Sequence, residues 1–244
     1  MKRFGNSTPR YRLFCFPYAG GGASIFRSWQ MDIGPSIEIH PIRLRGRETR
    51  IAEAPLVSVG EIVESVVAEI LPMLQTPFAL FGYSFGALLA FETARRLRRD
   101  GISPDRLMVA ALKAPHLQLR REPIHHLPQP ELAAEIRRFR GTPDAVLDNP
   151  ELMNLVLPTI RADFTAYETW QYEAEAPLDC PITAMGGATD ASVRPDELSA
   201  WREQTSASFA SHIFPGGHFF LDNARTLLTW TVVQDLLPAF RVAS

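Results

Sequence analysis

The stretch Phe78-Ala79-Leu80-Phe81-Gly82-Tyr83-Ser84-Phe85-Gly86-Ala87 decides the fold of this 244-residue chain. An apolar run leads into the pattern Gly-x-Ser-x-Gly, and residues suited to a helix follow it. This order of strand, tight turn and helix is typical of a nucleophile elbow, which holds a serine in strained backbone geometry with its hydroxyl clear of the sheet. Gly82 and Gly86 leave room where the strand and the helix crowd together. We therefore predict that Ser84 is a nucleophile; the alternative is a glycine-flanked serine in an ordinary loop.

The residues after the elbow predict a helix that ends near Gly101. Its apolar positions recur at helical spacing, and its last turns carry arginines, whose positive charge suits a helix C-terminus. The apolar residues are Ala87, Ala90, Phe91, Ala94 and Leu97, and the arginines are Arg95, Arg96, Arg98 and Arg99. Unpaired N–H groups at the start of this helix would stabilise negative charge near Ser84.

Apolar runs elsewhere predict further strands, with helices between them. Strands are expected at 12–16, 37–42, 106–112, 181–187 and 209–214, and helices after an N-cap at Ser24, over 59–74 and over 223–237. This alternation implies an α/β fold, with a mostly parallel central sheet flanked by helices on both faces. Nothing in the interior resembles a flexible linker, so we predict that residues 1–244 form a single domain.

The alternation of strands and helices lapses between about residues 117 and 178. Helix signals start at Pro130, then after a loop over 144–150, and again beyond Pro158. An insertion of this size in a sheet protein usually covers something, so we predict a helical lid over an apolar pocket. The alternative is a helical layer that packs as ordinary core.

The composition argues against several classes of protein. A hydrophobic fraction of 46% and a charged fraction of 21% are ordinary for a soluble globular domain, and a net charge of -2 gives no reason to expect nucleic acid as a partner. Residues 1–10 lack the apolar region of a signal peptide, and no stretch is apolar enough to cross a membrane, so a cytoplasmic location is expected. Cys15 and Cys180 each lie beside a predicted strand, which suggests buried thiols and neither a disulfide framework nor a zinc site.

A glycine-rich turn, Tyr18-Ala19-Gly20-Gly21-Gly22-Ala23, follows the first predicted strand. It lacks the spacings of the two common phosphate-binding glycine motifs. It could instead place a backbone N–H beside a reacting carbonyl, as the loop after an early strand does in α/β-hydrolases. A plain tight turn is the alternative, and the serine elbow downstream favours the oxyanion function.

A second loop, Arg43 to Arg50, contains four arginines in eight residues. These side chains could meet a phosphate-bearing substrate arm or an acidic carrier surface. A run of charge of this kind is more often a solvated loop. The sequence leaves both interpretations open.

A serine nucleophile requires a histidine to accept its proton. Of the six histidines, His218 alone occupies a glycine-opened loop directly after the last predicted strand, at the end of the sheet where Ser84 lies. His40 precedes the serine, and the remaining four lie before or within the predicted lid or inside a strand; these are His116, His125, His126 and His212. We therefore predict His218 as the base.

The histidine in turn requires a carboxylate to orient it, and in α/β-hydrolases the chain order is serine, acid, histidine. Asp190 follows a predicted strand as His218 does, and it is the predicted acid. Asp179 precedes that strand and would lie at the opposite end of the sheet. Asp196 and Glu197 fit the first turn of a helix after a proline.

Four motifs, taken in order, resemble the type II thioesterases that accompany polyketide synthases and nonribosomal peptide synthetases. They are Phe16-Pro17-Tyr18-Ala19-Gly20-Gly21, Gly82-Tyr83-Ser84-Phe85-Gly86, Gly187-Ala188-Thr189-Asp190 and Gly217-His218-Phe219-Phe220-Leu221. The similarity runs from about Leu13 to Leu237. It implies an α/β-hydrolase fold with a helical lid, and hydrolysis of acyl groups from the phosphopantetheine arms of carrier proteins, which would edit or release stalled or mis-primed chains.

On this resemblance Ser84 is the nucleophile, His218 the base and Asp190 the orienting acid. The oxyanion donors would be the backbone N–H groups of Ala19 and Phe85. The family's chemistry calls for no metal and no organic cofactor, because the phosphopantetheine is part of the carrier-bound substrate. The expected partners are an acyl or peptidyl carrier protein and its acyl thioester, with no nucleic acid and no membrane.

The sequence departs from the family pattern at three places. Tyr83 stands where many members have histidine, and its side chain is expected to point away from the chemistry. Leu44-Arg45-Gly46-Arg47 replaces a Pro-Gly-Arg type of loop, and Leu112-Lys113-Ala114-Pro115-His116 replaces a Ser-Gly-Arg-Arg-Ala-Pro-like segment. The last two departures bear on carrier or acyl preference.

Other functions remain compatible with the same residues. A carboxylesterase or lipase would use the same triad, although the His-Gly-Gly-Gly loop of many such enzymes is absent here. A thioesterase that releases finished chains and a non-catalytic binding protein on a hydrolase fold are the further alternatives.

Overall fold

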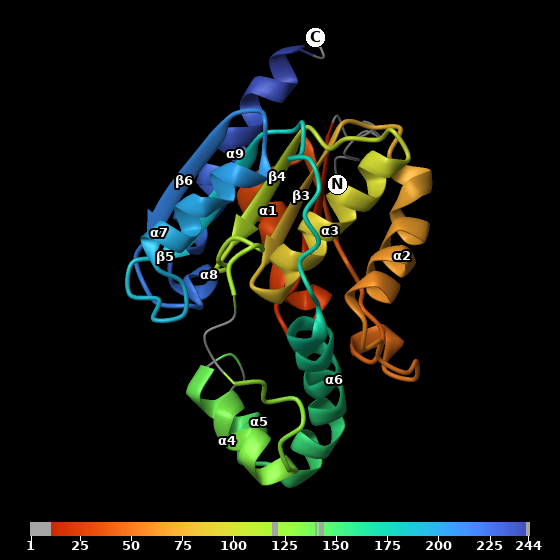
Figure 1. The fold of residues 1–244 in the computed structure, drawn as a ribbon, viewed down its shortest axis with the longest axis vertical. Coiled ribbons are helices and arrows are strands. Elements are labelled where there is room, and N and C mark those ends of the chain that lie inside the picture. Colours follow the sequence, from red (N-terminus) through yellow and green to blue (C-terminus); the bar gives the residue numbers. More distant parts are fainter. Residues whose placement is uncertain (1–10, 119–121, 140, 142–143, 243–244) are drawn as a thin grey trace, which may run out of the picture.

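A computed structural model describes residues 11–118, 122–139, 141 and 144–242. Both ends of the predicted 1–244 domain and short parts of the predicted 117–178 insertion lie outside the described residues. Within them, one parallel sheet of six strands runs through the molecule (Figure 1). A separate group of helices lies beyond the carboxyl ends of the strands.

The sheet has the strand order β2-β1-β3-β4-β5-β6, and each neighbouring pair is parallel. The strands are β1 (Tyr11–Phe16), β2 (Ile37–Pro41), β3 (Phe78–Tyr83), β4 (Arg106–Ala110), β5 (Ile182–Gly187) and β6 (Phe209–Phe214). The central strands are apolar on both sides because helices cover both faces of the sheet. The predicted parallel α/β sheet is confirmed.

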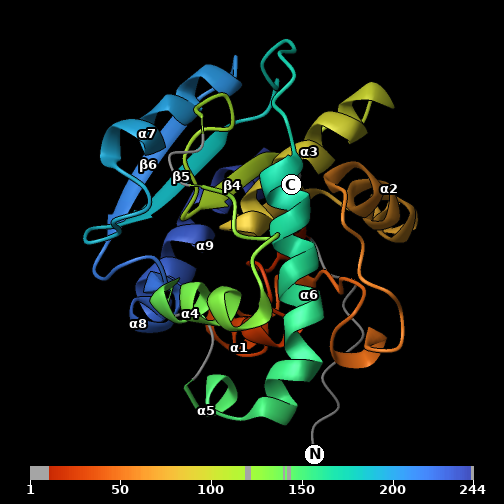
Figure 2. The same ribbon diagram turned by 60° about the horizontal axis from the view of Figure 1, so that its bottom comes forward.

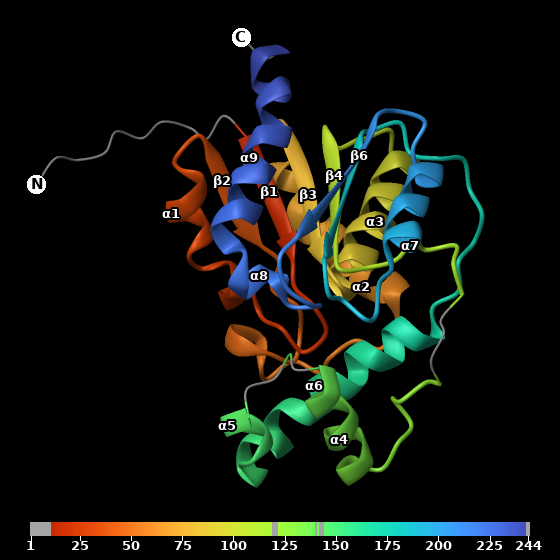
Figure 3. The same cartoon turned by 90° about the vertical axis from the view of Figure 1, so that its left-hand side faces the viewer.

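Helices cover the two faces of the sheet as separate layers (Figure 3). One layer contains α1 (Trp29–Ile33), α8 (Phe220–Asn223) and α9 (Arg225–Val242); the other contains α2 (Val59–Ile70), α3 (Phe85–Arg99) and α7 (Pro195–Ser199). Side chains of β1 alternate between the layers: Phe14 and Phe16 pack in the cluster with α2 and α3, whereas Leu13 and Cys15 pack in the cluster with α1 and α9. The period of two in a strand thus builds two cores from one apolar run.

Helices between β4 and β5 form a third group, called here the cap (residues 117–178). They are α4 (Gln129–Phe139), α5 (Asp144–Leu147) and α6 (Pro150–Thr169). The described part of the cap has a small apolar cluster of its own, in which Leu132, Met153 and Leu157 are buried. Figure 2 shows α6 and α4 lying across the end of the sheet where the strands finish.

Four local predictions were wrong. The cap helix α6 runs unbroken through Pro158, and α5 lies in the predicted 144–150 loop. A proline costs an internal hydrogen bond, but burial of Leu157 and Ile160 on either side offsets that cost. Ser24 is not an N-cap, because it lies inside a short 3-10 helix (Ala23–Phe26) whose N-cap is Gly22. The predicted helix over 59–74 ends at Ile70 and continues as a 3-10 turn.

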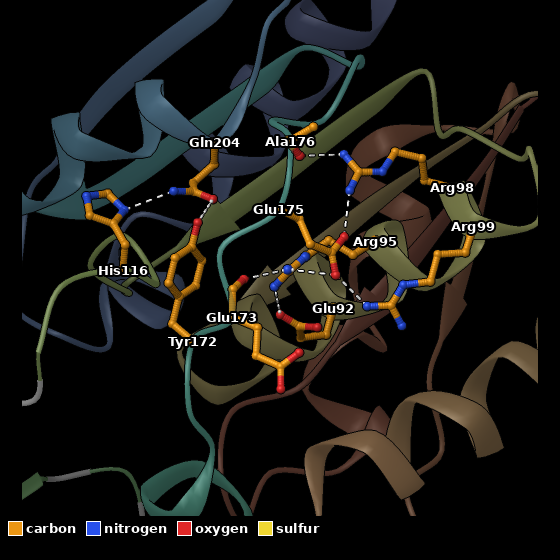
Figure 4. A network of polar contacts seen from close by, with 10 residues as sticks. All are labelled: Glu92, Arg95, Arg98, Arg99, His116, Tyr172, Glu173, Glu175, Ala176 and Gln204. Atoms are coloured by element: carbon orange, nitrogen blue, oxygen red, sulfur yellow. Dashed lines mark hydrogen bonds and ion pairs between the residues drawn. The ribbon is translucent and has the colours of Figure 1, made fainter.

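The chain that returns from the cap to β5 is attached to α3 by arginines (Figure 4). Arg95, only 4% exposed, pairs with Glu92 and Glu175 at 2.8 Å each and donates to the Glu173 carbonyl at 2.6 Å. Arg98 donates to the carbonyl of Ala176 at 2.6 Å. The predicted helix-end arginines therefore do more than complement the helix dipole, since they fix residues 173–177 against the sheet layer.

Two further findings bear on the sequence predictions. Cys15 and Cys180 are both free and buried, as expected, and burial, followed by the charge of Asp179, raises the pKa of Cys180 to about 12. Among the described residues, no helix is both long enough and apolar enough to cross a membrane.

Replacing Arg95 should destabilise the protein. In Arg95→Met, Glu92 and Glu175 lose a buried partner, and breaking such a pair costs about 3–5 kcal/mol. Arg96→Met is the matched control, because Arg96 pairs with the exposed Glu64 and Asp100 and a surface pair contributes at most about 1 kcal/mol. Urea denaturation measures both; equal losses in the two variants would contradict the structural importance of Arg95.

Candidate active site

The proposed nucleophile lies at the turn between β3 and α3. Ser84 joins β3 to α3 with φ 53° and ψ -118°, a left-handed conformation that a non-glycine residue rarely adopts. A Cβ on Gly82 would overlap the backbone of Gly86, and a Cβ on Gly86 would overlap the backbone of Phe16. Gly82 is therefore required by the close approach of β3 and α3, as the sequence predicted, whereas Gly86 is required by the close approach of α3 to the end of β1.

The structure brings Ser84, His218 and Asp190 together. Nε2 of His218 lies 3.0 Å from Oγ of Ser84, and Nδ1 lies 2.9 Å from Oδ2 of Asp190. The carboxylate is an acceptor, so Nδ1 carries the proton and Nε2 accepts a hydrogen bond from the serine hydroxyl. The arrangement can move a proton from the hydroxyl to the imidazole.

Asp190 is held as a buried, ionised group. Its side chain has 0% exposure, and its other oxygen accepts the N–H of Ser192 at 2.7 Å. Burial acts to raise the pKa of Asp190, but the hydrogen bond and charge of His218, with hydrogen bonds from Ser192, outweigh it and lower the pKa below its usual value. The carboxylate therefore stays charged through the neutral range.

The loops that carry the acid and the histidine support one another. The N–H of Thr189 donates to the carbonyl of Gly216 at 2.9 Å, and the N–H of Ala188 donates to the carbonyl of Phe214 at 2.8 Å. A Cβ on Gly187 would overlap the backbone of Gly217, so the end of β5 lies directly against the histidine loop. Parallel pairing of β5 with β6 thus fixes the separation of Asp190 from His218.

Two residues that line the same cavity as Ser84 have backbone N–H groups without an acceptor in their own element or turn. Phe85 is the first residue of α3, so its N–H has no acceptor within the helix. Within the described residues, the N–H of Ala19 has no hydrogen-bond acceptor. Both residues line the cavity beside Ser84 and His218. These two N–H groups are therefore the candidate donors for negative charge that develops near the serine.

The cavity above Ser84 has a volume of about 320 Å³. The sheet contributes Ser84, His218 and the loops around them, and the cap contributes apolar side chains that include Phe139, Ile160 and Phe164. The departure at 112–116 also reaches the cavity, through Leu112 and Lys113. Because the inserted helices line a pocket over the serine, the interpretation as a lid is favoured over that of plain core.

In the arginine loop, Arg43 and Arg45 are exposed, as the solvated-loop alternative expects, but Arg47 differs from both predicted alternatives. Arg45 and Arg50 pair with Glu53 at 3.3 and 2.7 Å, whereas Arg47 is buried and binds Asp163 of α6. Arg47 is thus neither solvated nor available to a phosphate. One signal could have identified Asp163, namely that it interrupts the apolar face of a helix, where an unpaired carboxylate would be costly.

The other candidate groups lie elsewhere. Asp179 accepts from the Ser103 hydroxyl at the amino end of the strands, and Asp196 and Glu197 lie in the first turn of α7, as predicted. Four of the remaining histidines contact other carboxylates or amides, namely His40 with Glu69, His116 with Gln204, His125 with Glu168 and His212 with Asp235. The ring centroid of His126 lies 5.6 Å from that of His125.

The sequence missed a contact of Tyr83. Its hydroxyl donates to the backbone carbonyl of His218 at 2.6 Å and accepts the N–H of Leu221 at 3.2 Å. Its ring packs beneath the histidine loop at the end of β3, so the side chain does point away from the cavity but supports the loop from below. Burial raises the pKa of Tyr83 well above its usual value, so the phenol keeps the proton that it donates.

The thioesterase domain family matches residues 11–231 of this chain. The chain is 45% identical over 217 residues to the gramicidin S biosynthesis protein GrsT of Aneurinibacillus migulanus, a match that covers 88% of this chain and 85% of that protein. The chain therefore belongs to the thioesterase family, whose activity is the hydrolysis of thioesters.

Solved structures agree with this assignment. The thioesterase RedJ, from the prodiginine biosynthetic pathway of Streptomyces coelicolor, is similar with a TM-score of 0.87 and 38% identity, over 94% of this chain and 87% of that one. BorB, the type II thioesterase from the borrelidin biosynthetic cluster, is similar with a TM-score of 0.87 and 36% identity, over 94% of each chain. The fold is that of the α/β-hydrolases, as predicted.

Removal of the Tyr83 hydroxyl should loosen the histidine loop. In Tyr83→Phe the buried carbonyl of His218 and the N–H of Leu221 lose their partner, and such losses cost about 1–3 kcal/mol. The raised pKa keeps the phenol protonated in the folded protein, whereas in the unfolded chain it ionises near pH 10, so wild type loses part of its advantage at high pH and the difference in unfolding free energy should be smaller at pH 10.5 than at pH 7. Urea denaturation at both values tests this; a difference that is equal at pH 7 and pH 10.5 would mean that Tyr83 titrates normally in the folded protein.

Proposed function

We propose that this protein is a serine thioesterase that hydrolyses acyl groups from the phosphopantetheine arm of a carrier protein, and so edits or releases stalled or mis-primed chains in polyketide or nonribosomal peptide biosynthesis. The observation that carries the proposal is the contact chain Ser84–His218–Asp190 at the floor of an apolar cavity. Similarity to GrsT and to the type II thioesterase BorB supports the assignment to such pathways.

In the first step His218 takes the proton of Ser84 while the serine oxygen attacks the thioester carbonyl. Asp190 holds the imidazole in the correct tautomer and stabilises its positive charge. The N–H groups of Ala19 and Phe85 bind the oxyanion, and loss of one such donor costs about 10²–10³ in rate. The C–S bond then breaks, and His218 returns the proton to the leaving pantetheine sulfur.

In the second step water replaces the carrier thiol. His218 takes a proton from the water while the water oxygen attacks the carbonyl carbon of the acyl-enzyme. The same two N–H groups bind the second oxyanion. Collapse of that intermediate restores the Ser84 hydroxyl and releases a free acid. Serine, histidine, aspartate and backbone amides supply every group that these steps require, so the proposal includes no metal and no organic cofactor.

The proposal also covers the partner, the location and the organisation of the chain. The substrate arrives on an acyl or peptidyl carrier protein, so neither nucleic acid nor a membrane takes part, and the protein works in the cytoplasm. Residues 1–244 act as one hydrolase domain. The cap is its lid, since its side chains line the cavity that would receive the acyl group.

The direct test uses one carrier protein loaded with acyl groups of increasing length, with release of free acid followed by mass spectrometry. Wild type should hydrolyse these thioesters. Ser84→Ala should be slower by about 10⁵–10⁶ and Asp190→Asn by about 10⁴. Full turnover by Ser84→Ala would contradict the proposed nucleophile.

The same experiment distinguishes the alternatives. Preference for short or aberrant acyl groups fits editing, whereas preference for long, finished chains fits product release. Faster hydrolysis of matched oxygen esters than of carrier thioesters would instead indicate a carboxylesterase.

A further inference from the structure

The cap helix α6 contacts the backbone of the glycine loop directly. The N–H of Gly20 donates to Oδ2 of Asp163 at 2.7 Å, and the Asp163 side chain is only 1% exposed. Gly20 has φ +76°, and a Cβ there would lie 2.7 Å from Cγ1 of Ile160, which also belongs to α6. The loop that carries Ala19 is therefore shaped against this helix.

Arg47 completes the contact. Its guanidinium binds Asp163 through two parallel hydrogen bonds of 2.7 Å each, and the same Nη1 donates to the carbonyl of Gly21 at 3.0 Å. A carboxylate and a guanidinium thus hold a backbone N–H and a backbone carbonyl of adjacent residues. This arrangement is called here the Arg47–Asp163 clamp. The planar fork of arginine is needed for it, because a lysine ammonium cannot make both parallel bonds.

Neighbouring hydrogen bonds also join the glycine loop, residues 46–48 and α6. The Glu48 carboxylate accepts the N–H groups of Ala23 and Ser24 at 2.9 and 3.0 Å. Burial opposes ionisation of Glu48, but hydrogen bonds from Ser24 and Ala23 outweigh it and lower its pKa. Thr159 of α6 donates its hydroxyl proton to the Gly46 carbonyl at 2.6 Å. The glycine loop, residues 46–48 and α6 therefore form one hydrogen-bonded unit.

We propose that Asp163 and Arg47 are positioning residues that aim the Ala19 N–H at the developing oxyanion. This inference rests on the proposed function. Ala19 immediately precedes Gly20 in a tight turn closed by the Gly21 N–H and the Tyr18 carbonyl at 2.8 Å. Fixing Gly20 and Gly21 therefore fixes the direction of the Ala19 N–H.

The clamp makes the oxyanion donor depend on the cap. Asp163 reaches Gly20 only from α6, so the donor is aimed correctly only while α6 covers the cavity. Arg47 also balances the charge of Asp163, because a buried carboxylate without a partner would be strongly destabilising. A conformation in which α6 moves away from the glycine loop would therefore catalyse poorly, because Asp163 would no longer hold Gly20.

Conservative variants separate positioning from general damage. Asp163→Asn removes the negative charge that pairs with Arg47. Arg47→Lys keeps the positive charge but cannot make the two parallel hydrogen bonds. Each should lower kcat by ~10²-fold, the effect of a misplaced oxyanion donor, and leave KM within about threefold. Arg161→Met is the control on the same helix, because Arg161 binds carbonyls of His125 and Leu127 inside the cap; its kcat should stay within about twofold of wild type.

A binding measurement supplies the second readout. An acyl-pantetheine trifluoromethyl ketone accepts the serine oxygen at its carbonyl carbon, the serine proton passes to His218, and the resulting oxyanion requires the Ala19 donor. The matched amide analogue forms no such bond. Asp163→Asn and Arg47→Lys should lower the affinity for the ketone by ~10²-fold and the affinity for the amide by less than about threefold.

The outcomes distinguish a failure of the Arg47–Asp163 clamp from a failure of the proposed function. Wild-type kcat and ketone affinity in both variants would overturn the clamp, and so would equal losses for ketone and amide, which indicate general damage to the cavity. Thermal melting identifies a variant that does not fold, and Arg47→Lys alone then decides, because it retains the buried charge pair. If wild type neither hydrolyses carrier thioesters nor binds the ketone, the proposed function itself fails.

Discussion

The structure depends on one close approach, that of β3 to α3 across Ser84. Backbone atoms of α3 fill the space that a side chain at Gly82 would need, the end of β1 fills the space beside Gly86, and the turn between the two glycines holds Ser84 at φ 53°. That strained conformation persists because packing of the surrounding sheet and helix stabilises it. Parallel pairing then brings the ends of β5 and β6 to the same edge, where Asp190 and His218 meet the hydroxyl.

The cap acts on the site in two ways. Its apolar side chains line the cavity, and the Asp163 carboxylate reaches past them to the backbone of the glycine loop. At the far end of the cap, the contacts of Arg95 with Glu175 and Glu173 attach the returning chain to α3. The inserted helices are thus connected to the sheet layer at both the loop and the return, and this connection gives the cap a defined position above the serine.

Local sequence patterns were sufficient for the sheet, the elbow and the predicted positions of Ser84, Asp190 and His218, because each depends on a strand and the loop that directly follows it. The continuation of α6 through Pro158 was not predictable in this way, since packing within the cap outweighs the local cost of proline. The same limit applies to Arg47 and Asp163. Their pairing joins positions 116 residues apart, and nothing near either residue indicates the other.

The most direct test of the central claim is the reaction of the intact protein with a fluorophosphonate, followed by peptide mapping. The serine oxygen would displace fluoride at phosphorus while His218 takes the serine proton, so the account predicts one adduct, on Ser84. The same reaction should be much slower in His218→Ala. Absence of an adduct on wild type, or an adduct elsewhere with Ser84 unmodified, would contradict it.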